Sequence, residues 1–152
     1  MDVASRVARW LAHTRFVPTP VYRLMVLSWL VGGLLSLIFG PPFNVASQLD
    51  AEPQWFMWAY VALQIAASAL TLSGLYLVEE NIAQPEKLHR SLTMELVGII
   101  FLETCIAIQV TATFFSQPSF PTSGLVWMGI VFGLWILARV RDILRAIRRL
   151  TR

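Results

Sequence analysis

One carboxylate lies near the middle of a long apolar stretch of the chain. Glu103 falls within residues 92–115, most of which are apolar. If this stretch crosses a membrane, an ionised side chain at its centre costs about 2.5 to 3.5 kcal/mol, so the carboxyl group must be protonated, paired or in contact with water. No Lys or Arg lies at that depth, which disfavours an internal salt bridge. We therefore expect Glu103 either to carry a proton-linked function or to hold helices together through hydrogen bonds.

Uncharged polar residues recur at helical spacing around this carboxylate. Ala107 and Thr111 follow Glu103 at four-residue intervals, and Thr104 flanks the face that they form. The preceding apolar stretch carries a second polar face, on which Gln64 lies at a depth that could meet Glu103. Facing stripes of this kind would form a hydrogen-bond network or line a small aqueous path. The predicted intramembrane polar site comprises Glu103, Gln64, Ser68, Thr71, Thr104 and Thr111.

The motifs of common enzyme and metal sites are absent from the sequence. It contains no nucleophile with a neighbouring base, no phosphate-binding loop and no pair of catalytic carboxylates outside the apolar stretches. No cluster of His, Cys and carboxylates has the spacing of metal ligands, and the single Cys105 can form no internal disulfide. We therefore predict a protein that is not an enzyme and that uses neither a metal nor another cofactor.

The elements that position these residues are predicted to be membrane-spanning helices. Hydrophobic residues make up 57% of the chain and charged residues only 14%, against roughly 25% charged residues in an ordinary soluble domain. A helical span needs about 20 mostly apolar residues, and four stretches meet or approach this length: 21–39, 55–78, 92–115 and 123–139. The connections are short, so consecutive helices should pack antiparallel. The predicted fold is all-α, a single domain over 1–152 with four transmembrane helices in an antiparallel bundle.

The distribution of basic residues predicts the orientation of these spans. Basic residues near span ends are retained on the cytoplasmic side during insertion. All twelve lie before or at the start of the first span, between the second and third, or at or after the end of the fourth: Arg6, Arg9, Arg15, Arg23, Lys87, Arg90, Arg139, Arg141, Arg145, Arg148, Arg149 and Arg152. This pattern places both termini in the cytoplasm and the protein in the inner membrane. Glu95, one turn inside the cytoplasmic boundary, is then expected to be an interfacial residue that reaches water or Arg90.

Both ends of the chain are predicted to form short amphipathic helices on the membrane surface. Residues 1–18 and 140–152 place apolar and basic residues on opposite faces at helical spacing. The second helix would bind anionic headgroups through Arg141, Arg145, Arg148, Arg149 and Arg152. It could instead be an anchor continuous with the fourth span. An alternative for the N-terminus is a signal peptide cleaved near Val45-Ala46-Ser47. We expect lipid, not nucleic acid, to be the partner of these basic residues.

Small residues form stripes along three of the predicted spans. Helices in lipid associate through close backbone approach at such residues. The stripes are Ser28, Gly32, Ser36 and Gly40 in the first span, Ala62, Ala66, Ala69 and Ser73 in the second, and Gly129 and Gly133 in the fourth. They could serve packing within one protomer or between protomers. Three stripes are more than the packing within one protomer of so short a chain is expected to need, so we expect a homo-oligomer.

Three classes of function are compatible with these features. In size, number of spans, small-residue stripes and basic C-terminal tail the chain resembles the four-span holins of phage lysis cassettes, although it carries no signature motif. This resemblance implies a protein that oligomerises into a membrane lesion or pore. The alternatives are a small proton-coupled transporter that uses Glu103, and a structural or regulatory subunit that docks on other subunits of a membrane complex through its charged tail.

Overall fold

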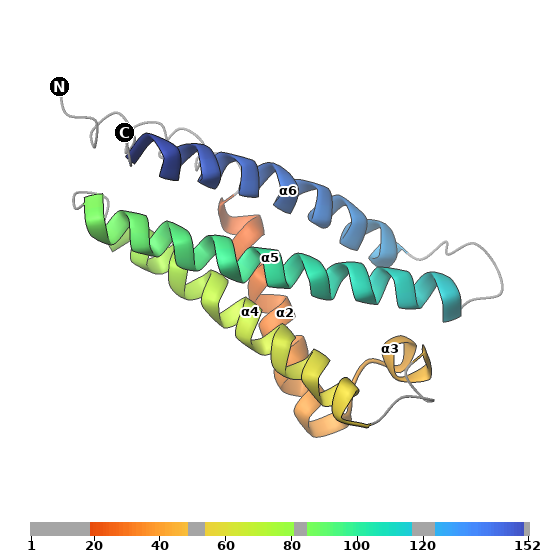
Figure 1. The fold of residues 1–152 in the computed structure, drawn as a ribbon. Coiled ribbons are helices and arrows are strands. Elements are labelled where there is room, and N and C mark those ends of the chain that lie inside the picture. Colours follow the sequence, from red (N-terminus) through yellow and green to blue (C-terminus); the bar gives the residue numbers. More distant parts are fainter. Residues whose placement is uncertain (1–18, 49–53, 81–84, 117–123, 151–152) are drawn as a thin grey trace.

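In the computed structural model, the residues described are 19–48, 54–80, 85–116 and 124–150. They form five helices, namely α2 (Thr19–Phe39), α3 (Phe43–Gln48), α4 (Gln54–Glu80), α5 (Pro85–Ser116) and α6 (Gly124–Leu150), and these ranges contain no strand (Figure 1). The prediction of an all-helical protein is therefore confirmed for this part of the chain. The predicted N-terminal helix over 1–18, and Arg152 at the other end, lie outside the described residues.

Three of the helices are long and apolar enough to cross a membrane. The stretches that qualify are Pro20–Phe39, Gln54–Leu77 and Glu86–Ser116. The predicted span 123–139 is the first part of α6, which continues without a break to Leu150. Its second half is rich in arginine, which lowers the hydropathy of the helix as a whole. No Gly or Pro follows Arg139 within α6, and the helix continues to Leu150, which agrees with the predicted alternative of a C-terminal segment continuous with the stretch 123–139.

The first long helix ends at a glycine with a left-handed backbone. Gly40 has φ of +92°, and its N–H donates to the Ser36 carbonyl oxygen at 3.0 Å. Glycine adopts this conformation without steric cost, and it is the usual residue just past a helix C-terminus. Pro41 and Pro42 follow and cannot continue the helix. The chain turns here into α3, which packs against the C-terminal part of α5.

Among the described helices, α4 and α5 make the most extensive contact, and glycine makes their close approach possible. A Cβ atom placed on Gly74 would lie 2.5 Å from the backbone nitrogen of Glu95. A Cβ atom on Gly98 would lie equally close to the backbone nitrogen of Thr71. The two glycines therefore let each helix place its backbone directly against the other, as small residues do between membrane helices. Neither glycine belongs to the small-residue stripes that the sequence singled out.

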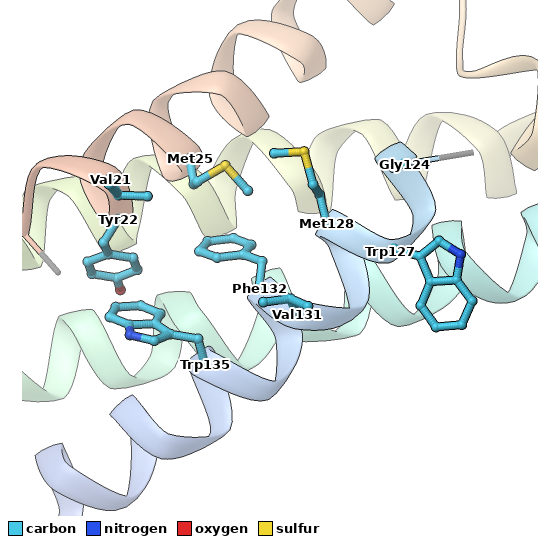
Figure 2. A pocket seen from close by; sticks show the side chains of 9 residues that line it. All are labelled: Val21, Tyr22, Met25, Gly124, Trp127, Met128, Val131, Phe132 and Trp135. Atoms are coloured by element: carbon cyan, nitrogen blue, oxygen red, sulfur yellow. The ribbon is translucent and has the colours of Figure 1, made fainter. Parts of the chain in front are cut away.

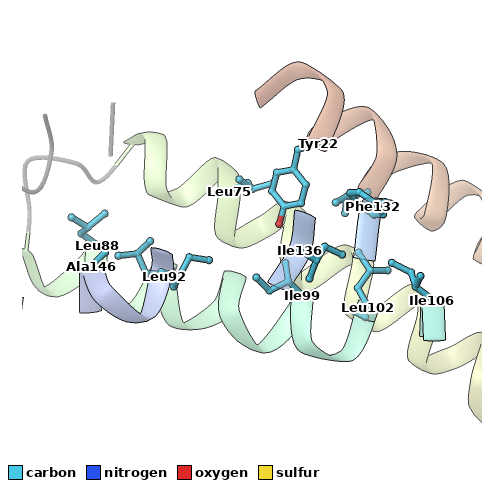
Figure 3. Packing of buried hydrophobic residues seen from close by; sticks show 13 residues of the cluster. Tyr22, Leu75, Leu88, Leu92, Ile99, Leu102, Ile106, Phe132, Ile136 and Ala146 are labelled. Carbon is cyan, nitrogen blue, oxygen red and sulfur yellow. The ribbon is translucent and has the colours of Figure 1, made fainter. Parts of the chain in front are cut away.

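Contacts join the four long helices in the order α2, α4, α5, α6. In Figure 1, α4, α5 and α6 alternate in direction, and α2 crosses behind α4 and α5 at an oblique angle. Buried apolar side chains fill the space between them, mainly from α5 and α6 (Figure 3). The two outer helices, α2 and α6, do not pack along their length. They meet where the Tyr22 ring contacts the rings of Phe132 and Trp135, with centroid distances of 6.4 and 4.5 Å. The arrangement is thus a row of helices that is open between α2 and α6.

Candidate functional site

A buried ion pair joins α5 to α6. The Arg139 guanidinium group donates from Nε to Glu95 Oε1 at 2.9 Å and from Nη2 to Glu95 Oε2 at 3.2 Å. Glu95 is 0% exposed and Arg139 is 9% exposed. This paired geometry is the strongest form of a carboxylate–guanidinium hydrogen bond. The interpretation of Glu95 as an interfacial residue in contact with water or Arg90 is therefore wrong, because the close approach of Gly74 encloses Glu95 between the helices.

Tyr22 of α2 closes this polar cluster from the third side. Its side chain is 3% exposed, and its hydroxyl group interacts electrostatically with both Glu95 and Arg139. The hydroxyl group lies outside hydrogen-bonding geometry with either residue. The Tyr22 ring also packs on the Trp135 ring, with a centroid distance of 4.5 Å, so that α2 contacts α6 beside the ion pair. One tyrosine and one ion pair thus connect three of the four long helices.

Glu103 lies against α6 and not against α4. A Cβ atom placed on Gly133 would be 2.9 Å from Glu103 Oε1 and 3.2 Å from Oε2, so the absence of a side chain at Gly133 provides the space that the carboxylate occupies. Oε2 is buried and has no hydrogen-bond partner among the described residues. The side chain as a whole is partly exposed. A partly enclosed carboxylate with an unsatisfied oxygen is an energetically costly arrangement in an apolar environment.

Gln64, the predicted partner of Glu103, is directed toward α2. Its Nε2 donates to the Trp29 carbonyl oxygen at 2.9 Å, and it lies beside Gly32 and Gly33. The structure therefore does not bring Gln64 and Glu103 together as the sequence led us to expect. The helical spacing placed both residues on polar faces. However, α4 has α2 on one side and α5 on the other, and Gln64 faces α2.

The other members of the predicted polar site are divided between the interior and the surface. Ser68 and Thr71 are buried in the contact of α4 with its neighbours. The Thr71 hydroxyl donates to the Ala67 carbonyl oxygen at 2.8 Å, whereas the Ser68 hydroxyl has no partner among the described residues. Thr104 and Thr111 are exposed, and the Thr104 hydroxyl donates to the Ile100 carbonyl oxygen. These six residues therefore do not form one continuous network.

The glycine stripes serve contacts within the protomer. In α6, Gly133 accommodates Glu103, and a Cβ atom on Gly129 would lie 3.3 Å from a Val110 methyl group. In α2, Gly32 borders Gln64, and Ser36 is buried with its hydroxyl donating to the Gly32 carbonyl oxygen. Ser28 is exposed and bonds to its own helix, and Gly40 ends that helix.

The stripe on α4 differs from the other two because it lies on the outside of the protomer. All four of its residues are exposed: Ala62, Ala66, Ala69 and Ser73. The opposite face of α4 makes the contacts with α2 and α5. This exposed small-residue face is thus not used in packing the described part of the chain.

A groove with two adjoining parts runs between α2 and α6. The first part has a volume of about 560 Å³ and is lined by apolar and aromatic side chains, among them Met25, Phe132 and Trp135 (Figure 2). The second part has a volume of about 360 Å³ and is lined in part by Ser28, Ser36, Gln64 and Gln109. Met25 and Met128 border both parts. This groove could not be predicted from the sequence, because it follows from the open contact between the first and last long helices.

Three basic residues of α6 beyond Arg139 lie on the surface. Arg141 and Arg145 are exposed and lie 4.0 and 3.9 Å from the Asp142 carboxylate, which is a weak surface arrangement. Arg148 is exposed too. The side chain of Arg149 and the whole of Arg152 lie outside the described residues. Within the part of the chain that the structure covers, no group of three or more His, Cys, Asp or Glu residues could hold a metal ion.

Comparison with known proteins gives no family assignment: no protein-family model matches the chain, and neither the curated proteins nor the solved structures contain a significant match.

Proposed function

We propose that the protein is a four-span inner-membrane protein that self-associates and opens a lesion or pore in the bilayer. The fourth span in this proposal is α6. Its 27 residues extend about 40 Å at 1.5 Å per residue, and a bilayer core is about 30 Å thick. The arginine that interrupts its apolar part, Arg139, has its charge balanced by Glu95, which lowers the cost of placing it between helices.

The orientation proposed for these spans follows from where the basic residues lie. Lys87 and Arg90 lie near the start of α5, and the pairing of Glu95 with Arg139 brings the arginine-rich part of α6 to the same end of the molecule. The opposite end, where α3 packs on Ser116 of α5, has no Lys or Arg among the described residues. The positive-inside rule then favours a cytoplasmic location for the basic end.

The observation that carries the proposal of self-association is the exposed small-residue face of α4. Two glycine-containing stripes are used inside the protomer, whereas Ala62, Ala66, Ala69 and Ser73 remain outside. In lipid, helices gain little from hydrophobic contact and associate where small residues let backbones approach. Two copies that pair through this face would use the same type of contact that joins α4 and α5 within one copy. Thr104 and Thr111 on the exposed part of α5 could then border water within an assembly.

Controlled expression in a bacterium tests this proposal. We expect the membrane potential, followed with a voltage-sensitive dye, to collapse abruptly and growth to stop. The variant Ala66→Ile/Ala69→Ile should delay or abolish the collapse, because two bulky side chains keep the α4 faces apart. The matched control Leu37→Ile changes an exposed residue of α2 and should behave as the unaltered protein does. Slow, tolerated accumulation of the unaltered protein would refute the lesion, and equal timing in all variants would refute the role of the α4 face.

A second candidate function, proton-coupled transport, is favoured by one observation. Glu103 has a buried carboxylate oxygen without a partner among the described residues and lies against Gly133 of the neighbouring helix α6. A carboxyl group in this situation can gain or lose a proton as the helices move. Proton flux into liposomes, read with an enclosed pH-sensitive dye, should be lost in Glu103→Gln while the protein remains folded. Unchanged flux would exclude this candidate.

A further inference from the structure

We propose that the groove between α2 and α6 is a binding site for a neutral amphipathic molecule drawn from the membrane. In this proposal the head group of the molecule forms hydrogen bonds in the part of the groove that contains Gln64 and Gln109. Its hydrocarbon chain lies along Tyr22, Phe132 and Trp135. The site is complete within one copy of the chain, so it does not depend on self-association.

The apolar part of the groove has the size and lining of a binding site for a hydrocarbon chain. Its volume of about 560 Å³ falls within the range of about 300 to 1,000 Å³ that is typical of small-molecule sites. In Figure 2 the side chains of Met25 and Phe132 face one another across the gap, and the Tyr22 ring lies over Trp135. The stacked rings of Phe132 and Trp135, inclined by only 7°, form one wall. Methionine side chains adapt to irregular apolar partners, which suits a flexible chain.

The polar part of the groove contains a buried amide with an unused oxygen. Gln64 is only 5% exposed, and its Oε1 has no hydrogen-bond partner among the described residues although its Nε2 bonds to Trp29. Ser28 and Ser36 donate their hydroxyl protons to carbonyl groups of their own helix, which leaves the hydroxyl oxygens as acceptors. A buried polar group without a partner is costly, so a ligand that supplies hydrogen-bond donors here gains free energy.

The charge of the lining residues defines the class of ligand. None of the side chains that line either part of the groove is charged. Of the nearby ionisable groups, Glu95 pairs with Arg139 and Glu103 lies against Gly133, and none of these three charged side chains lines the groove. An ionic head group would lose its hydration without finding a counter-charge. The oxygen acceptors of the polar part match a head group with hydroxyl donors, so the ligand class is a neutral lipid with hydroxyl groups and one long chain, such as a monoacylglycerol.

The proposal can be tested with a brominated lipid, because bromine quenches tryptophan fluorescence on contact. The protein for this experiment is the full chain in detergent micelles, with Trp135 retained and Phe at the other five tryptophans. The probe is a monoacylglycerol with a 9,10-dibromostearoyl chain. We expect quenching that saturates near one probe per protein chain. Gln64→Leu should weaken the apparent affinity about tenfold, the effect of losing one to two hydrogen bonds in an apolar site.

Two further variants separate the groove from the general lipid surface. Met25→Phe fills the apolar part and should reduce saturable quenching. Leu134→Phe should leave the quenching unchanged, because Leu134 of α6 is 64% exposed and does not line the groove. Dibromostearate and a dibromoalkyl trimethylammonium ion should bind at least tenfold more weakly than the neutral probe. Quenching that rises linearly with probe and is equal in all variants would overturn the proposal. Equal binding of the charged probes would overturn the assignment of a neutral ligand.

The same measurement distinguishes this site from the proposed lesion. The Ala66→Ile/Ala69→Ile variant alters a face of α4 that does not border the groove. Quenching by the neutral probe should therefore be unchanged in that variant, even if the variant no longer collapses the membrane potential. Loss of saturable quenching in this variant would show that the site requires association between copies, contrary to the proposal.

Discussion

Replacement of Glu95 by Gln should destabilise the protein far more than the loss of one surface charge. The substitution keeps the size and hydrogen-bonding oxygen of the side chain but leaves the Arg139 guanidinium group without its counter-charge. Because both side chains are at least nine-tenths buried and form two hydrogen bonds, the pair belongs to the class in which removal of one partner costs about 3 to 5 kcal/mol. For a chain of about 150 residues this corresponds to a fall in Tm of about 10 °C.

The double variant Glu95→Gln/Arg139→Gln separates the interaction energy of the ion pair from the effect of removing either charge alone. With both charges removed, no unpaired charge remains buried, so the double variant should be more stable than Glu95→Gln alone. The free energy of unfolding can be followed by circular dichroism in mixed micelles as a denaturing detergent is added. Glu86→Gln, which alters an exposed acidic residue in the first turn of α5, is the control and should change stability by less than about 0.5 kcal/mol. If the effects of Glu95→Gln and Arg139→Gln simply add, the reasoning is refuted.

The glycine contacts give two further predictions. Gly98→Ala should destabilise the protein by about 1 to 3 kcal/mol or more, because the added methyl group meets backbone atoms of α4 that cannot give way. The control Gly124→Ala should not destabilise it, because no atom lies within 4 Å of the new methyl group. Equal unfolding curves for the two variants would contradict this prediction. Gly133→Ala should displace the Glu103 carboxylate and lower stability, and Glu103→Ser in the same chain should restore it, as thermal unfolding would show. No recovery in the double variant would mean that another contact limits the space at Gly133.

The parts of the fold that depend on composition and periodicity could be predicted from the sequence. All-helical structure and three apolar helices of membrane length are confirmed for the described residues. The end of the first helix at Gly40 follows from local backbone chemistry, because glycine and the two prolines after it act without reference to the rest of the chain.

The candidate site was harder to predict because it depends on which helix lies beside which face. Helical spacing identified Gln64 and Glu103 as intramembrane polar residues, but it could not show that one faces α2 and the other α6. The pairing of Glu95 with Arg139 joins residues 44 positions apart. A signal for it existed in the sequence, since each is an ionisable residue just inside a predicted span and their charges are opposite. Gly74 and Gly98 were missed because each is a single glycine outside any repeated stripe.

The unbroken course of α6 has a mechanical consequence. Its firmest polar attachment to a neighbour is at Arg139, which divides the helix into an arm of about 22 Å toward Gly124 and an arm of about 16 Å toward Leu150. Buried apolar side chains lie on both sides of this point, Phe132 on the long arm and Ile143 on the short arm, so the core holds both arms of one continuous helix. The long arm carries Trp127 and Phe132, which line the groove beside Met25. A substitution that displaces α6 at the Glu95–Arg139 pair is therefore expected to alter the lining of the groove as well, because the same unbroken helix carries both.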